Sequence, residues 1–321
     1  MKRVGIVFLQ LLVTGAGLWY VFHDQQKRAQ IADALRQADR TWILVGWLSY
    51  SAVEVIATVR WQMLLRIQGI ALGWLRTFAI VMIGLFFNMF LPGLVGGDAV
   101  RLYFVFKSAP RQKTRATLSV AMDRILGMLS ILFLVGLSVA LRFGWLSRSG
   151  ATLHIVYFVL GLLGAGCICV LLLFGAVCFG LLQKLPNRTP FRPAIMESGK
   201  ALRLYGAHLG IMSVAFAITV VAHIVLYLSF YCAAESLHGT RTASLSVTDF
   251  LSIMPLVNTV TALPISFGGV GVRETLFQEL LGNLAHVPPA IAAVSASLGF
   301  VIQASWGLLG AAVFLVLSHK K

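Results

Sequence analysis

Long apolar stretches with almost no charge constrain this chain more than any other feature of its sequence. Six of them reach the roughly 20 residues that a helix needs to cross a bilayer: 4–22, 41–64, 116–141, 151–182, 207–234 and 290–317. The chain is 59% hydrophobic and only 12% charged, whereas about a quarter of the residues in soluble domains are charged. We therefore expect an all-α polytopic membrane protein in which residues 1–321 form a single integral membrane domain.

The N-terminal apolar stretch, residues 4–22, follows Lys2 and Arg3 in the manner of a secretory signal. It is nevertheless long, and no convincing small-residue cleavage site accompanies it. We expect the protein to keep this stretch as its first span.

The remaining composition argues against several classes of function. The net charge of +15 is divided among short loops between the apolar stretches, so we expect no nucleic-acid partner. The four cysteines lie inside apolar runs and lack the paired spacing of a metal or disulfide site. No ATP-binding loop of the G-x-x-x-x-G-K-[ST] kind occurs in the sequence. We expect no metal and no cofactor.

Two further apolar stretches, about residues 77–97 and 250–272, are interrupted by proline and glycine. When both are threaded so that they enter and leave the membrane on the same side, the cytoplasmic segments hold twice as many Lys and Arg residues as the outer segments. Membrane insertion favours such an excess on the cytoplasmic side. The charge distribution therefore predicts about six spans and two re-entrant segments, with both termini in the cytoplasm.

The two interruptions carry the same motif. LPGLVGGDAVR (residues 91–101) and LPISFGGVGVR (residues 263–273) share the pattern L-P-x-x-x-G-G-x-x-V-R. Three spans separate the copies, so the second is inverted relative to the first, as in many transporters with broken helices. Non-helical backbone at membrane depth is tolerated where it lines protein or a watery cavity. The pair of motifs therefore predicts a shared polar cavity.

Each copy contains groups suited to holding an anion. Pro92 and Pro264 are expected to end the inbound helix, and the glycines let the chain reverse close to a ligand. A new helix then begins, and its unpaired N–H groups and dipole attract anions. Arg101 and Arg273 follow about one turn later, where a guanidinium can grip a phosphate or carboxylate with two hydrogen bonds.

The charged and polar residues near the motifs have two interpretations each. Asp98 either caps the new helix or contacts the substrate, and Glu274 pairs either with Arg273 or with an arginine of the first motif. Asn88 and Asn258 either line the cavity or bond a neighbouring helix.

Three charged residues inside the spans are expected to face the interior, because charges are costly in lipid. They are Glu54, Asp123 and Arg124. Together they form either a structural network of ion pairs that holds helices together or part of a transport pathway.

Asn88 followed by LPGLVGGDAVR, together with LPISFGGVGVRE, resembles the flippase-like transmembrane domain of lysyl-phosphatidylglycerol synthases and its stand-alone relatives of the YbhN and AglD type. The resemblance covers nearly the whole chain, because the order of spans and breaks fits as well. It implies a multi-pass protein of a bacterial or archaeal cytoplasmic membrane. It also implies that the protein moves lipids between leaflets, such as aminoacylated phosphatidylglycerol or polyprenyl-phosphate sugars.

The resemblance implies the substrate-binding positions as well. They are Asn88, Pro92, Gly96, Gly97, Asp98 and Arg101 in the first motif, and Pro264, Gly268, Gly269, Gly271, Arg273 and Glu274 in the second. We add Asn258 to this set. The synthases of this family append a soluble domain that transfers an aminoacyl group from tRNA, whereas this chain ends at Lys321, so we do not expect it to aminoacylate lipids by itself.

The leading hypothesis is a lipid flippase or scramblase. An anionic headgroup would be held by Arg101, Arg273 and the helix termini while its tails stay in lipid, because desolvating an isolated charge costs many kcal/mol. Energy would come from ion gradients or from lipid supply. Candidate proton carriers are Glu54, Asp123 and Glu274.

Two other classes of function stay open. A membrane-embedded transferase or phosphatase acting on a lipid phosphate would need a nucleophile or general base beside the arginines, and the histidines lack a partner carboxylate at a telling spacing. The chain would otherwise be an accessory subunit of a lipid-modifying enzyme. The expected partners are therefore membrane lipids with an anionic headgroup, together with a second copy of the chain or such an enzyme.

Overall fold

The computed structural model describes Trp19 and residues 25–90, 96–179, 192–240, 245–263 and 265–319. These residues form α-helices and short 3-10 turns, and no strand occurs among them. The expected first span lies outside the described residues apart from Trp19, and so do Pro92 and Pro264.

The described helices follow one another along the chain with short connections. The first half contains α2 (Gln25–Arg36), α3 (Arg40–Ile67), α4 (Trp74–Phe90), α5 (Gly96–Ser108), α6 (Lys113–Leu146) and α7 (Gly150–Cys178). The second half contains α8 (Arg192–Ala207), α9 (Leu209–Glu235), α10 (Val247–Thr261), α11 (Val272–Ala285) and α12 (Pro289–His319). The 3-10 turns are η1 (Pro110–Gln112), η3 (His238–Thr240) and η4 (Phe267–Gly269).

Five helices among the described residues are long and apolar enough to cross a bilayer: α3, α6 with η1, α7, α9 and α12. They coincide with the last five of the six expected spans. Their outer faces carry exposed large apolar side chains, such as Leu44 and Leu48 on α3 and Leu171 and Leu172 on α7. Apolar surface of this extent suits contact with lipid. The chain is an all-α, multi-pass membrane protein.

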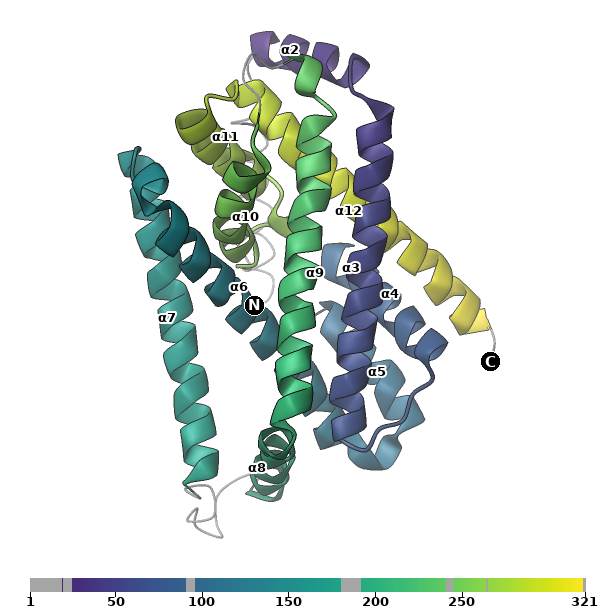
Figure 1. The fold of residues 1–321 in the computed structure, drawn as a ribbon. Helices are drawn as coiled ribbons and strands as arrows, with labels where there is room; N and C mark the ends of the chain where they lie inside the picture. Colours follow the sequence, from purple (N-terminus) through teal and green to yellow (C-terminus); the bar gives the residue numbers. More distant parts are fainter. Residues whose placement is uncertain are drawn as a thin grey trace.

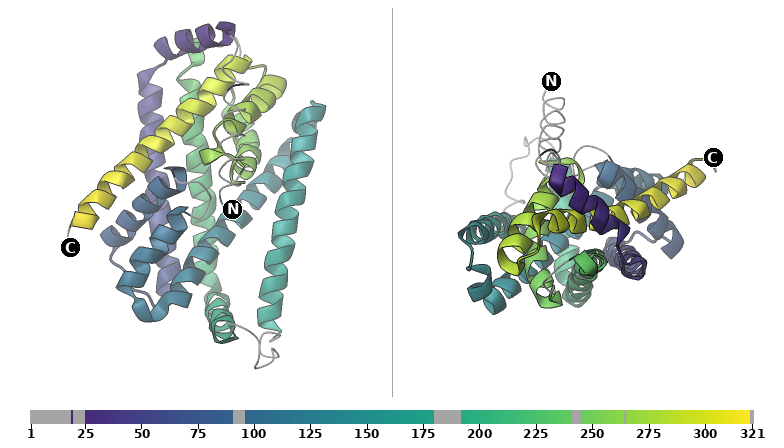
Figure 2. Two further views of the ribbon diagram at one scale, coloured as in Figure 1. Left: turned by 180° about the vertical axis from the view of Figure 1, so that it is seen from behind. Right: turned by 90° about the horizontal axis from the view of Figure 1, so that it is seen from above.

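Two pairs of short helices interrupt this pattern of spans. The first hairpin, α4 and α5, starts and finishes at the lower end of the bundle in Figure 1, whereas the second hairpin, α10 and α11, starts and finishes at the upper end. The view from behind in Figure 2 shows the same opposed arrangement. Each hairpin is broken at its motif, since α4 ends at Phe90 and α10 ends at Thr261. The predicted pair of inverted re-entrant segments is confirmed.

The tips of the two hairpins meet inside the bundle. A methyl group added at Gly268 would lie 3.7 Å from the carbonyl oxygen of Met89 and 3.2 Å from the ring of Phe300. Met89 belongs to the first hairpin and Phe300 to α12. The two breaks therefore lie next to each other in the bundle.

The last helix, α12, contacts both hairpins. A Cβ atom at Gly310 would lie 2.0 Å from the carbonyl oxygen of Met82, so only glycine lets α12 approach α4 this closely. Nearer its start, the hydroxyl of Ser297 donates a hydrogen bond of 3.1 Å to Glu274 of α11. One helix therefore contacts the first hairpin along its backbone and the second through a partly buried hydrogen bond.

The α3 helix begins at a side-chain cap outside the membrane span. The carboxylate of Asp39 accepts a hydrogen bond of 2.8 Å from the backbone N–H of Thr41. This bond satisfies one of the free amides at the helix start, and it lowers the pKa of Asp39 below its ordinary value of 3.8. The start of α10 is capped in the same way by the hydroxyl of Ser246, which accepts from the N–H of Thr248.

Candidate functional site

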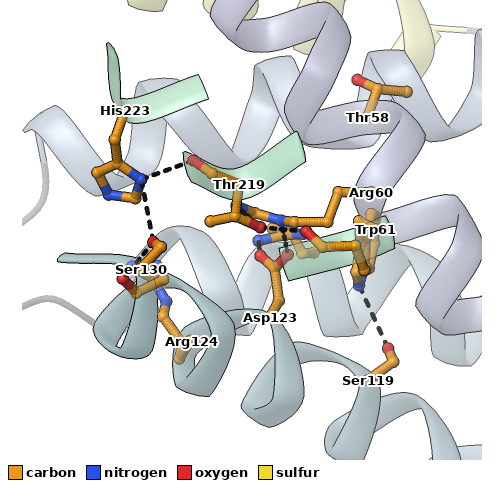
Figure 3. A network of polar contacts seen from close by, with 12 residues as sticks. Thr58, Arg60, Trp61, Ser119, Asp123, Arg124, Ser130, Thr219 and His223 are labelled. Carbon is orange, nitrogen blue, oxygen red and sulfur yellow. Dashed lines mark hydrogen bonds and ion pairs between the residues drawn. The ribbon is translucent and has the colours of Figure 1, made fainter. Parts of the chain in front are cut away.

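A single carboxylate, Asp123 of α6, joins the first hairpin to two spans. It accepts a hydrogen bond of 2.7 Å from Nε of Arg60 on α3 and one of 3.1 Å from Nη1 of Arg101 on α5. Figure 3 shows Arg60 and Asp123 facing each other. The Asp123 side chain is 5% exposed, so these pairs are shielded from water. Such pairs are strongly destabilising to break, because removing one partner leaves a buried charge.

A second carboxylate, Asp98, pairs with the next residue of α6. Its two oxygens accept hydrogen bonds of 2.7 and 2.8 Å from Nε and Nη2 of Arg124, and Nη1 of Arg101 lies 3.5 Å away. Asp98 lies within the first turn of α5, so the expectation that it caps the helix is wrong. Asp123 and Arg124 pair with different partners, and the Arg124 side chain is 49% exposed. Arg124 nevertheless lines the polar cavity described below, together with Glu54 and Asp123.

Neutral side chains hold the two buried arginines in place. The Arg101 guanidinium carbon lies 4.0 Å from the ring centre of Trp61, an attractive cation–π contact. The indole N–H of Trp61 in turn donates to the hydroxyl of Ser119 at 3.2 Å, as Figure 3 shows. Nη1 of Arg60 donates to Thr219 of α9 at 3.4 Å. The cluster thus includes helices α3, α5, α6 and α9.

The glycines of the first motif allow α5 to lie directly against α4. Gly96 begins α5, and a Cβ atom at Gly97 would lie 2.1 Å from the carbonyl oxygen of Gly84. A Cβ atom at Gly84 would meet the side chain of Arg101 at 2.8 Å. The N–H of Gly97 donates to Oδ1 of Asn88 at 3.0 Å. The expectation of a free amide at Gly97 is therefore wrong, because the asparagine of the same motif occupies it.

A polar cavity of about 160 Å³ lies against this cluster. Its lining residues come from α3 to α6: Glu54, Ala57, Arg60, Val81, Gly84, Leu85, Asn88, Arg101, Asp123 and Arg124. The volume is sufficient for a few water molecules held by polar groups. A polar cavity was expected, but the described lining includes no residue of the second hairpin, so it is not shared between the two motifs.

Arg273, the matching arginine of the second motif, has a different environment. It is 8% exposed, and Nη2 donates to the carbonyl oxygen of Gly268 at 3.0 Å. The guanidinium carbon lies 5.4 and 5.1 Å from the ring centres of Phe230 and Phe300. Nη1 is buried without a hydrogen-bond acceptor, and no carboxylate of the described residues lies within 4.0 Å of the guanidinium.

The glycines of the second motif act through backbone conformation. Gly268, Gly269 and Gly271 have φ angles of 57°, 78° and 83°, a region that residues with a Cβ atom rarely adopt. The carboxylate of Glu274 accepts a hydrogen bond of 2.7 Å from the N–H of Gly271 and one from Ser297. Glu274 therefore caps its own helix, and both expected ion pairs of Glu274 are wrong. The amide of Gly271 is occupied as well.

Two residues of α3, one turn apart, lie between the two motif arginines. Glu54, 6% exposed, interacts with the hydroxyl of Tyr50 and with the charge of Arg101. Tyr50, 2% exposed, interacts in turn with the charge of Arg273. These two buried side chains of α3 therefore interact with the charges of both motif arginines.

Asn88 and Asn258 have different roles: one lines the cavity, and the other bonds a neighbouring helix. Asn88 lines the polar cavity and also bonds Gly97. Asn258 donates from Nδ2 to the Tyr227 hydroxyl at 3.4 Å and is absent from the cavity lining. Asn258 therefore connects α10 to α9.

Sequence reasoning missed three residues of α3 that shape the site: Tyr50, Arg60 and Trp61. A signal for Arg60 was present, because an arginine inside a span is costly in lipid. Tyr50, Glu54 and Trp61 also recur at helical spacing, which places them on one face of α3. Their partners lie on helices distant in sequence, so no local pattern identified them.

Comparisons with known proteins place this arrangement in a family. Residues 7–317 match the family described as lysylphosphatidylglycerol synthase TM region. The chain belongs to this family. The expected family resemblance is thereby confirmed over nearly the whole chain.

The individual relatives match only part of this chain. The chain is similar to UPF0104 membrane proteins of Methanocaldococcus jannaschii (25% identical over 143 residues, 40% of this chain and 43% of the relative) and Methanothermobacter thermautotrophicus (27% over 139 residues, 42% and 38%). A UPF0104 membrane protein of Pyrococcus horikoshii is 26% identical over 133 residues, 41% of this chain and 38% of the relative. The matched region therefore spans about two fifths of each of these relatives.

Proposed function

We propose that this protein moves lipids with an anionic, phosphate-bearing headgroup between the leaflets of a bacterial or archaeal cytoplasmic membrane. The substrate class comprises modified phospholipids and polyprenyl-phosphate-linked lipids, whose tails stay in the bilayer while the headgroup crosses. On this proposal the protein is a transporter rather than an enzyme.

Arg273 is the observation that carries the proposal. A guanidinium at membrane depth is costly unless an anion or acceptor neutralises it, and Nη1 of Arg273 has no acceptor among the described residues. A phosphate oxygen would supply the missing acceptor and place a negative charge directly against the guanidinium. A Cβ atom at Gly269 would lie 3.1 Å from Nη2 of Arg273, so a glycine at this position keeps the guanidinium uncrowded.

Arg124 is the best candidate for first contact with a headgroup. Its guanidinium is half exposed at the polar cavity even though it is bonded to Asp98. Arg101 differs from Arg124 in its burial, because its side chain is only 9% exposed and pairs with Asp123 inside the protein. We assign to Arg101 the role of holding the first hairpin against α6, and to Arg273 the role of binding the headgroup near the middle of the bundle.

Charge distribution supports an orientation with the lower end in the cytoplasm. The end of α3, the start of α4, the end of α5 and the start of α6 lie at that end in Figure 1, whereas α2, the start of α3 and the end of α6 lie at the upper end. The sequences at the lower helix ends include Arg66, Arg76, Lys107, Arg111, Lys113 and Arg115, and those at the upper ends include Arg36, Arg40, Arg142 and Arg148. An excess of Lys and Arg on the cytoplasmic side is what insertion favours. In this orientation the first hairpin is entered from the cytoplasm and the second from outside.

The test is lipid exchange by purified protein in liposomes containing fluorescent phosphatidylglycerol, read by quenching of the outer leaflet. Arg273→Gln should slow exchange at least about tenfold, equivalent to ~1.4 kcal/mol in the barrier, because the headgroup loses its cationic partner. Arg142→Gln is the matched control, since Arg142 pairs with Asp249 at the upper end, away from both motifs.

Each outcome of this test decides between functions. Exchange slowed by Arg273→Gln but not by Arg142→Gln supports the transporter. Exchange by the wild-type protein that is unchanged in Arg273→Gln contradicts it. Chemical conversion of the labelled headgroup, read by chromatography of the extracted lipid, would instead assign the protein to the transferase or phosphatase class.

A further inference from the structure

Charges of opposite sign are equal in number around the two motifs. The four arginines are Arg60, Arg101, Arg124 and Arg273, and the four carboxylates are Glu54, Asp98, Asp123 and Glu274. With every group ionised the site is neutral. An anion bound at Arg273 would leave one excess negative charge in a region of low dielectric constant, where such an imbalance is expensive. A carboxylate that takes up a proton would restore neutrality.

Three of the four carboxylates accept short hydrogen bonds from arginines or from backbone and hydroxyl donors. Asp123 bonds two arginines, Asp98 bonds Arg124 through both oxygens, and Glu274 accepts from a backbone N–H and a hydroxyl. Glu54 has no ion pair within 4.0 Å among the described residues. It interacts with the hydroxyl of Tyr50, one turn earlier on α3, and a hydroxyl can bond either form of a carboxyl group. Glu54 is therefore the carboxylate that is easiest to protonate.

Position also favours Glu54 as the site of protonation. It lines the polar cavity, whose volume admits water that can deliver a proton. Through Tyr50 it also lies next to the charge of Arg273. The same side chain is therefore in reach of cavity water on one side and of the unpaired arginine on the other.

The charged and titratable groups that face Glu54 come from several helices. They are Tyr50 and Arg60 on α3, Arg101 on α5, Asp123 and Arg124 on α6, and Arg273 on α11 through Tyr50. Helix α4 contributes the neutral Asn88, and α12 contributes the neutral Gln303 as a partner of Tyr50. On α9 the titratable group is His223, which bonds Ser130 and the carbonyl of Thr219 and lies near Arg60.

Resting on the proposed function, we propose that Glu54 binds a proton when an anionic headgroup binds at Arg273, so that lipid movement is coupled to proton movement. The proton passes from water in the cavity to a carboxylate oxygen of Glu54, and it returns to water when the headgroup leaves. Lipid anion and proton therefore travel together, and the site stays neutral in both states. A proton gradient across the membrane can then bias the direction of exchange.

The first test measures the proton directly and needs no transport. Infrared difference spectra of the purified protein, taken with and without dihexanoyl phosphatidylglycerol, should show a new carbonyl band of a protonated carboxyl group in the wild type. The band should be lost in Glu54→Gln and shifted in Glu54→Asp. Glu279→Gln, which alters a glutamate of α11 bonded to Asn283 at the upper end, should keep it.

If Glu54→Gln fails to fold, two other measurements still test whether Glu54 takes up a proton. Proton uptake by the wild-type protein on addition of the same lipid, followed with a pH-sensitive dye in weak buffer, should rise with lipid and saturate. The Glu54→Asp spectrum reports the same site with a carboxyl group retained. A wild type that binds the lipid without taking up protons, or a band that persists unchanged in a folded Glu54→Gln, would overturn the proposal.

The second test is transport, and it separates this inference from the proposed function. An imposed pH gradient should speed exchange of fluorescent phosphatidylglycerol by the wild type several-fold, whereas Glu54→Gln should exchange lipid at a rate that the gradient does not change. Exchange in the wild type that ignores the gradient contradicts the coupling but leaves the transporter intact. Proton uptake at Glu54 without any lipid exchange contradicts the transporter but leaves the proton site.

Discussion

The two hairpins carry the same eleven-residue pattern, yet they place its arginine in opposite electrostatic situations. Arg101 is neutralised by Asp123, approached by Asp98 and covered by Trp61. Arg273 lies between two phenylalanine rings with an unsatisfied Nη1 and no described carboxylate within 4.0 Å. The repeated sequence fixes the backbone break and the position of the guanidinium, whereas residues outside the repeat determine whether that guanidinium is neutralised.

The two copies of an inverted repeat can therefore serve different roles, one in stability and one in anion binding. An arginine paired with a carboxylate stabilises the contacts between helices, whereas one without a carboxylate partner keeps its attraction for an anion. We therefore expect substitutions in the first hairpin mainly to lower the stability of the protein, and substitutions in the second mainly to lower its activity.

The largest expected effect is the loss of Asp123. Asp123→Ala leaves Arg60 and Arg101 buried without their common partner, and breaking buried pairs of this kind costs about 3–5 kcal/mol. Thermal unfolding in detergent micelles should show a strongly lowered Tm or failure to fold. Asp249→Ala breaks the ion pair of Asp249 with Arg142, which is more exposed than the pairs of Asp123. This change should cost about 0–1 kcal/mol. Equal losses in the two variants would contradict the structural role of the first cluster.

A smaller effect is expected from closing the space between α4 and α5. Gly97→Ala places a Cβ atom 2.1 Å from the Gly84 carbonyl oxygen, and relieving such overpacking costs roughly 1–3 kcal/mol. The matched control is Gly136→Ala on α6, where nothing lies within 4 Å of the added atom. Tm is measured for both. A Gly97→Ala protein as stable as the control would show that the hairpin can open without penalty.

The smallest expected change in stability concerns the side chains that cap the starts of α3 and α10. Because the N–H of Thr41 lowers the folded pKa of Asp39 below 3.8, its capping contribution is complete above that value. It is lost as the pH falls through the lower folded pKa. Asn caps about as well but does not titrate, so acid should lower Tm more in the wild type than in Asp39→Asn. Ser246→Asn at α10 should leave the acid response unchanged, and an equal response in all three proteins would contradict this assignment.

Much of the fold follows from the sequence alone because its signals are local. Runs of about 20 apolar residues predict spans, and five of the six expected spans coincide with described helices. The paired glycines and the balance of basic residues predicted two re-entrant segments, and both are present. Local composition therefore carries the topology of this chain.

The site was predicted less completely, because side-chain partners depend on contacts between distant segments. A cap was one alternative for Asp98, and an ion pair was expected for Glu274, but Asp98 bonds Arg124 of another helix whereas Glu274 caps its own. The amides of Gly97 and Gly271 were expected to be free, and a side chain occupies each. Burial favours such internal satisfaction of N–H groups.

The contact of α12 with both hairpins has a mechanical consequence. Gly310 lies against the Met82 carbonyl, and Ser297 bonds Glu274. A displacement of either hairpin would therefore move α12 and, through it, the other hairpin. Opening toward one leaflet and closing toward the opposite one would then be a single event, and a larger residue at Gly310 would alter motion at a tip on the far side of the molecule.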